Sequence, residues 1–104
     1  MKPLRDLHNG YIRLTGERWE HIESEHPEMF GLLKMIQEVL LAPNRIVRSR
    51  TAPEVELFYR DYESTPVSHK FLCTVVKVLT NDLFVIIAYF TDTTKKGKVL
   101  WEKK

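Results

Sequence analysis

The chain has 104 residues, of which 16 are Lys or Arg and 14 are Asp or Glu, so its formal net charge is only +2. This length fits one domain with one core, and no apolar run approaches the roughly 20 residues that a membrane-spanning helix requires. The first residues lack the apolar stretch of a secretory signal, and the single cysteine excludes an internal disulfide. We therefore expect one cytoplasmic domain over residues 1–104 with no membrane partner.

The first predicted element is an amphipathic helix that begins after Thr15, a favourable N-cap residue. Trp19, Ile22 and His26 recur at helical spacing, and glutamates occupy most of the other positions. The helix should end before Pro27, because proline disfavours the α region for the residue that precedes it. His26 then lies at a helix end, either as a solvated residue favoured by the helix dipole or as an imidazole that exchanges protons near neutral pH.

A second helix is predicted from Glu28 to Leu41, where apolar residues follow helical spacing and Pro43 prevents continuation. After Pro43 the sequence is rich in β-branched and aromatic residues, interrupted by turn-forming residues. The predicted strands are Ile46–Arg50, Val55–Tyr62, Lys70–Leu79, Leu83–Thr91 and Lys98–Trp101. This order predicts an α+β fold in which two N-terminal helices pack on a four- or five-stranded antiparallel sheet.

A turn at Asn81-Asp82 would place Leu79 opposite Phe84 in a hairpin. The face expected beneath the helices would then carry Phe71, Cys73, Val75, Phe84, Ile86, Ala88 and Phe90. The opposite face would carry, at its end away from the turn, a polar cluster of Lys70, Thr74, Tyr89 and Thr91. Lys77 and Tyr89 fall on opposite faces, so they are not expected to share a site.

Basic residues concentrate in the second part of the chain. Residues 44–104 hold eleven Lys or Arg against seven Asp or Glu, a charge of +4, whereas residues 1–43 hold five against seven, a charge of −2. This asymmetry suits a phosphate-bearing partner but is also common on solvated surfaces. Alternation predicts Arg48 and Arg50 on the face of Tyr59 and Arg60 on the other face, so Arg48 and Arg60 are alternatives for one site; a bulge would exchange them.

No metal or cofactor site is predicted. Zinc requires three or four ligands in a recognisable spacing, whereas His21 and His26 are five positions apart and lie on different helical faces. Four scattered glycines provide no phosphate-binding loop. His21 and Glu25 have the spacing of an exposed salt bridge, and Cys73, among apolar neighbours, is expected to be a small buried side chain.

The succession of these segments resembles the phage and bacterial nuclease-like domains of the barnase, EndoU, colicin and RelE superfamily. The resemblance spans about residues 12–102. It is carried most specifically by the helix that ends in His26-Pro27-Glu28, by the strand end Ala88–Asp92 and by the later segment Gly97–Trp101. It implies a metal-independent ribonuclease or a toxin-like RNA-cleaving effector.

Metal-free RNA cleavage needs a base for the ribose 2′-hydroxyl, an acid for the leaving 5′-oxygen, and cations or donors around the phosphorane. The resemblance implies His26, Tyr89, Thr91 and Lys70 as catalytic residues, and Arg48, Arg60 and Thr74 as substrate-binding residues. In this scheme His26 is the acid or base, whereas Tyr89 and Thr91 donate to phosphate. The imidazole of His26 must therefore reach the sheet end that carries Tyr89.

Each of these residues also has a purely structural interpretation. Tyr89 can close the core, Thr91 is a good strand former, and Lys70 can protect a sheet edge. The chain could instead be a non-catalytic protein-interaction module, because both predicted sheet faces are largely apolar and a partner or a second copy can cover one of them. An inhibited toxin covered by an antidote protein combines the two interpretations, so RNA, an antidote protein and self-association remain open as partners.

Overall fold

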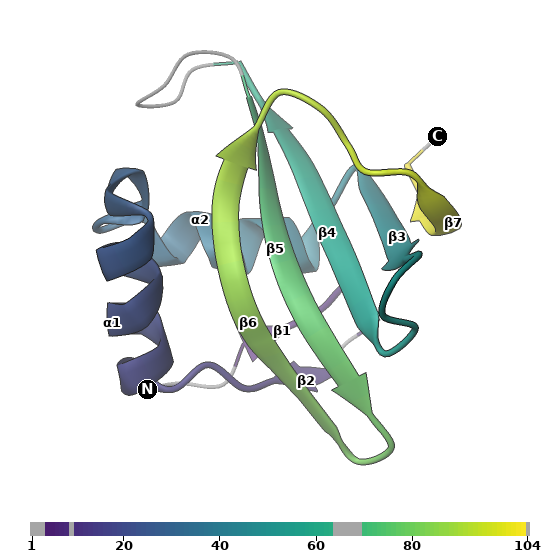
Figure 1. Ribbon diagram of the computed structural model, residues 1–104, viewed down its shortest axis with the longest axis horizontal. Coiled ribbons are helices and arrows are strands. Elements are labelled where there is room, and N and C mark those ends of the chain that lie inside the picture. The colour runs from purple at the N-terminus through teal and green to yellow at the C-terminus, as the bar shows by residue number, and fades with distance from the viewer. Residues whose placement is uncertain (1–3, 9, 64–69, 104) are drawn as a thin grey trace.

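The computed structural model describes residues 4–8, 10–63 and 70–103 (Figure 1). In chain order its elements are β1 (Leu4–Arg5), β2 (Tyr11–Ile12), α1 (Gly16–Glu25), a 3-10 turn (Pro27–Met29), α2 (Leu33–Leu41), β3 (Arg45–Ser49), β4 (Val55–Tyr62), β5 (Lys70–Leu79), β6 (Asp82–Thr91) and β7 (Gly97–Glu102). The last five strands form one antiparallel sheet in the order β6-β5-β4-β3-β7, and β1 pairs with β2 in a separate small sheet. The predicted α+β architecture is confirmed, whereas the small sheet was not predicted.

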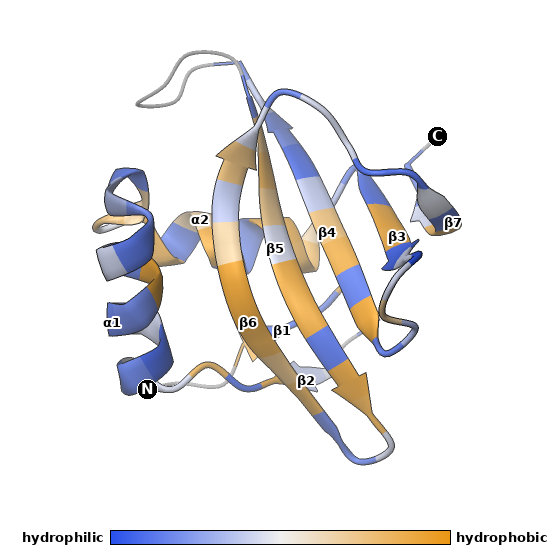
Figure 2. Ribbon diagram, in the orientation of Figure 1, coloured by the Kyte–Doolittle hydropathy of each residue, from blue (hydrophilic) through white to orange (hydrophobic). Residues whose placement is uncertain are grey.

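The helices cover one face of the five-stranded sheet. α2 crosses behind the sheet and α1 runs beside β6 (Figure 1), with the apolar side of α1 turned toward the strands (Figure 2). The core between these layers includes Ile22, Ile36 and Leu40 from the helices and Leu72, Val76 and Val85 from the strands. Within the described ranges no helix has the length and apolar character needed to cross a bilayer.

Helix α1 has the ends that the sequence predicts. Thr15 Oγ1 accepts a hydrogen bond from the Arg18 N–H at 3.1 Å, and the His26 N–H closes the last turn on the Ile22 carbonyl at 2.8 Å. The predicted start of the second helix at Glu28 is wrong. Pro27 begins a separate 3-10 turn, and Gly31, at φ 76°, adopts a left-handed conformation that interrupts the helical path before α2.

The β5–β6 hairpin has a different register from the predicted one. Leu79 pairs with Asp82, so the two-residue connection is Thr80-Asn81 and the predicted pairing of Leu79 with Phe84 is wrong. Between Val75 and Val76 the register shifts, because β6 contains one additional residue, Ile86. A bulge of this kind inverts the alternation on one side of the shift, and a sequence pattern alone does not reveal it.

The helices cover the other face of β5 from the one predicted, and the bulge keeps the end of β6 on its predicted side. The open face, which the helices do not cover, carries the buried residues Val47, Leu57, Tyr59, Cys73 and Val75 and the half-buried residues Phe71, Ile86 and Tyr89. Phe71, Cys73, Val75 and Ile86 are therefore on the opposite side from the one predicted, whereas Ala88 and Phe90 do pack in the helix-covered core. The open face is thus more apolar than expected near its centre.

The connection between β6 and β7, residues 92–96, passes across the end of the open face (Figure 1). The Lys95 N–H donates to the Tyr59 hydroxyl at 2.9 Å, and Arg45 Nη1 lies 3.4 Å from Thr94 Oγ1. Beyond this crossing, β7 approaches β3 so closely that a Cβ at Gly97 would lie 2.3 Å from the Arg48 carbonyl oxygen. These contacts hold the crossing segment, with the backbone of Lys95, against the end of the open face.

Candidate active site

The imidazole of His26 contacts both Glu28 and Tyr89. Its Nδ1 lies 3.3 Å from Glu28 Oε1, and its ring centroid lies 5.8 Å from that of Tyr89 at an interplanar angle of 29°. The structure therefore brings His26 and Tyr89 together, as the catalytic interpretation requires. Because a carboxylate beside Nδ1 favours the proton on that nitrogen, the lone pair of the neutral ring is placed on Nε2. Within the described residues Nε2 has no hydrogen bond or ion pair, and the side chain is 31% exposed.

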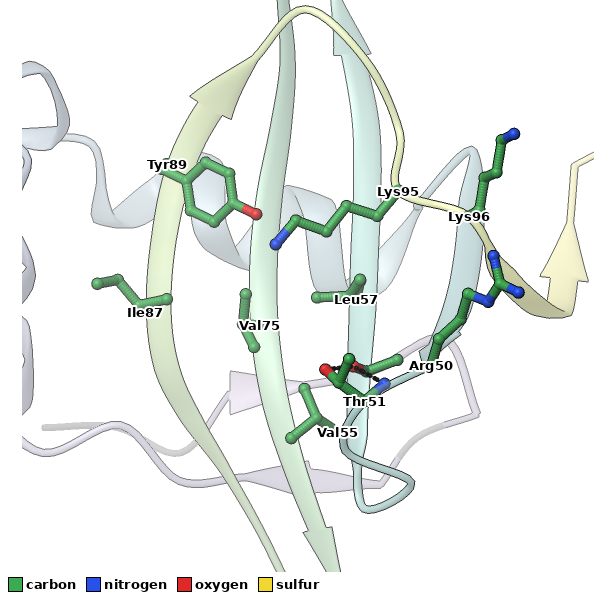
Figure 3. A pocket seen from close by; sticks show the side chains of 10 residues that line it. Arg50, Thr51, Val55, Leu57, Val75, Ile87, Tyr89, Lys95 and Lys96 are labelled. Carbon is green, nitrogen blue, oxygen red and sulfur yellow. Dashed lines mark hydrogen bonds between the residues drawn. The ribbon is translucent and has the colours of Figure 1, made fainter.

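The hydroxyl of Tyr89 lies on the open face, over β5 (Figure 3). Burial raises the pKa of Tyr89 well above its usual value, and the neighbouring Cys73 and Tyr59 raise it further. The phenol therefore remains protonated at neutral pH and serves as a hydrogen-bond donor rather than as a base.

Cys73 lies beneath this hydroxyl and is chemically quiet. Burial raises the pKa of its thiol to about 11, although the hydroxyls of Tyr89 and Tyr59 act in the opposite direction. The thiolate is the reactive form of cysteine, and it is scarce at neutral pH under these conditions. The prediction of a buried, unpaired cysteine is confirmed.

A groove of about 530 Å³ occupies the open face beside Tyr89. Its apolar floor consists of Val55, Leu57, Val75 and Ile87, and its rim carries Ser49, Arg50, Thr51, Lys95 and Lys96 as well as Tyr89. The Lys95 side chain extends over the sheet toward the Tyr89 hydroxyl (Figure 3). We call this feature the basic groove. Its apolar floor can pack against a flat ring such as a nucleic-acid base, and its cations can bind phosphate.

Three predicted site residues do not contribute free polar groups to the basic groove. Thr74 is fully buried on the helix-covered side, so its assignment to substrate binding is wrong. Lys70 forms an ion pair with Asp92 at the sheet end and does not line the groove. The Thr91 hydroxyl donates to the Thr93 carbonyl at 3.1 Å and accepts from the Thr93 N–H at 3.3 Å. Both hydrogen bonds stabilise the turn at which the crossing segment begins.

Neither predicted phosphate-binding arginine lies on the open face. Arg48 pairs with Glu56, and this register places it on the same side as Arg60. Arg60 donates to the Ala42 carbonyl at 2.6 Å and so satisfies the C-terminal end of α2. The prediction that Arg48 and Arg60 face opposite sides is wrong, because the β3–β4 register differs by one residue from the assumed one.

Arg50, Lys95 and Lys96 replace these arginines as the cations of the site. The sequence indicates a basic segment here, since Lys95 and Lys96 come shortly before the last predicted strand, which begins at Lys98. Their position over the open face could not be predicted, because it depends on the crossing of the β6–β7 connection. Among the described residues no group of three or more His, Cys, Asp or Glu side chains is arranged to hold a metal ion.

Replacing Thr74 with valine is expected to stabilise the fold by about 1 kcal/mol. The Thr74 Oγ1 is buried and has no hydrogen-bond partner among the described residues, and valine keeps the shape without the polar atom. Chemical denaturation of Thr74→Val measures the change. Thr91→Val is the matched control and should lose stability, because the Thr91 hydroxyl makes two hydrogen bonds. A loss of stability in Thr74→Val would contradict this account.

Comparison of the chain with protein-family models, with curated proteins and with solved structures finds no match. The chemical case for a function therefore depends on the geometry of His26, Glu28, Tyr89 and the basic groove.

Proposed function

We propose that this protein is a metal-independent ribonuclease, similar in fold and chemistry to the barnase, EndoU, colicin and RelE superfamily, that acts on RNA in the cytoplasm. One observation carries the proposal: the His26 imidazole, flanked by the Glu28 carboxylate, is stacked on Tyr89, whose hydroxyl borders the basic groove. A proton acceptor, a neutral donor and cations for phosphate thus follow one another across the open face, from β6 toward β3 (Figure 3).

The proposed reaction begins with proton transfer from a ribose 2′-hydroxyl to His26 Nε2. The 2′-oxygen then attacks the adjacent phosphorus, and the bond from phosphorus to the 5′-oxygen breaks. The leaving 5′-oxygen takes a proton from water, which the open groove admits, and the upstream product ends in a 2′,3′-cyclic phosphate. The Tyr89 hydroxyl and the Lys95 ammonium stabilise the negative charge that develops on the phosphoryl oxygens.

The basic groove supplies the binding energy for this reaction. Phosphates pair with Lys95, Lys96 and Arg50 at the rim, and a base covers the apolar floor. Glu28 acts as a positioning residue, because its contact with Nδ1 orients the imidazole without touching the substrate.

A non-catalytic protein-interaction module is the second candidate, and the apolar floor favours it. Val55, Leu57, Val75 and Ile87 line the groove without adding any side-chain donor or acceptor, and such a surface also suits an apolar side chain of another protein. An antidote protein seated there would block the ribonuclease site. Absence of RNA cleavage would leave this candidate as the better account.

Removal of the Tyr89 hydroxyl provides a test of the proposed ribonuclease. Tyr89→Phe is expected to slow RNA cleavage in EDTA by about 10²- to 10³-fold, the range found when one preorganised donor to a developing oxyanion is lost. Tyr11→Phe is the control, because Tyr11 is exposed on the small β1–β2 sheet. Equal rates for Tyr89→Phe and the parent protein would exclude the phenol from the mechanism, and inhibition of the parent by EDTA would contradict metal independence.

A further inference from the structure

We propose that the protein associates head to tail, with Phe30 of one copy inserted into the basic groove of a second copy. The association requires no RNA, so it can hold or fail independently of the proposed cleavage. Where both hold, an occupied groove is closed to RNA, and association restrains the enzyme.

Phe30 is a rigid apolar projection. Its side chain is 78% exposed, the highest fraction among the large apolar residues described. Its backbone is nevertheless fixed on both sides: the Phe30 N–H donates to the Pro27 carbonyl at 3.1 Å, and the Gly31 N–H donates to Glu23 Oε2 at 2.9 Å. The preceding residue, Met29, is completely buried. An aromatic side chain on a fixed backbone needs no ordering of the chain on binding, which suits an interface anchor.

The segment that leads to Phe30 has the charge opposite to that of the groove. Residues 16–31 contain five Glu and one Arg, which gives a formal charge of −4 with neutral histidines. The groove rim carries Arg50, Lys95 and Lys96 and, among its lining residues, no Asp or Glu. The apolar floor of the groove offers the aromatic ring a place away from water. Phe30 and the groove therefore complement each other in both charge and polarity.

The same charges argue against a symmetric dimer in which like surfaces meet. A symmetric pairing of two open faces would bring the cations of one groove against those of the other, and a pairing of two α1 surfaces would oppose two acidic segments. A contact between unlike surfaces brings opposite charges together. A single head-to-tail contact leaves a free Phe30 at one end and a free groove at the other, so further copies can add; a reciprocal dimer that cannot grow would contradict this arrangement.

Sedimentation velocity at low and high salt tests the proposal with two complementary variants. Phe30→Ala keeps the groove and removes the projection, whereas Lys95→Glu keeps the projection and reverses a groove charge. The parent protein is expected to form larger species at low salt that dissociate at high salt. Each variant alone should be monomeric, and an equimolar mixture of the two should form a 1:1 dimer that cannot grow.

Leu41→Ala is the control, because Leu41 is another exposed apolar side chain, at the end of α2. It should associate like the parent. Thermal unfolding of Phe30→Ala and Lys95→Glu establishes that both variants fold. A parent protein that is monomeric at every salt concentration would overturn the proposal, as would variants that associate like the parent or a mixture that remains monomeric.

Discussion

Replacement of His26 by alanine is expected to reduce the rate of RNA cleavage in EDTA by about 10²- to 10⁴-fold, the usual contribution of a positioned general base. The other groups of the site cannot replace the imidazole. Burial keeps Tyr89 protonated, and Cys73 is held as a thiol with a pKa of about 11. Binding of RNA to the basic groove should be retained, because His26 is not among the groove-lining residues. The measurement is the single-turnover cleavage rate, with binding followed separately by fluorescence anisotropy.

His21→Ala is the matched control for this variant. His21 also lies on α1 and is also paired with a glutamate, since its Nε2 is 3.1 Å from Glu25 Oε1. It does not line the basic groove. We expect His21→Ala to cleave RNA like the parent protein. Equal cleavage by His26→Ala and His21→Ala would remove His26 from the mechanism, and a parallel loss in both would indicate damage to α1 rather than to a base.

Leu72→Ala is expected to lower the free energy of unfolding by about 2–5 kcal/mol, the usual cost of a cavity in a packed core. In the structure the Leu72 side chain is fully buried, because the helices cover the face of β5 that carries Leu72 and Val76. If the helices covered the face of Cys73, as the sequence predicts, Leu72 would lie on the open face. This prediction therefore measures which face of β5 is covered as well as the packing.

Leu79→Ala is the control for Leu72→Ala, since the Leu79 side chain is 42% exposed near the tip of the same hairpin. The free energy of unfolding of Leu79→Ala should fall much less than that of Leu72→Ala. Urea unfolding of both variants gives the comparison, provided that the dependence on urea concentration stays the same. Similar losses in the two variants would contradict the arrangement of β5 described above.

The sequence predicts the elements of this fold well, because their signals are local. The Thr15 cap and the proline at position 27 set the two ends of α1, and alternating β-branched residues mark the long strands. The contact between His26 and Tyr89 was a requirement of the catalytic interpretation and does not follow from these local signals, because it depends on the packing of α1 beside β6.

The assignment of faces could not be predicted, because it depends on which face of the sheet the helices cover and on single-residue shifts. The helices cover the face of β5 that carries Leu72 and Thr74, not the face of Cys73, and the additional residue in β6 leaves Ala88 on the covered side. A shift of one residue in the β3–β4 register places Arg48 on the helix-covered side. Apolar residues lie on both faces of β5, so the sequence does not show which face the helices cover. The cations of the site differ from the predicted ones because Arg48 lies on the helix-covered side and the β6–β7 connection brings Lys95 and Lys96 to the groove.

The most direct test of the proposed mechanism uses an oligodeoxynucleotide that contains one ribonucleotide, incubated with the protein in EDTA. We expect a single cut on the 3′ side of that ribonucleotide, with a 2′,3′-cyclic phosphate on the upstream product, because only there can a 2′-hydroxyl attack the phosphorus. No cut at the ribonucleotide, or equal cleavage of the all-deoxy strand, would contradict the proposed mechanism.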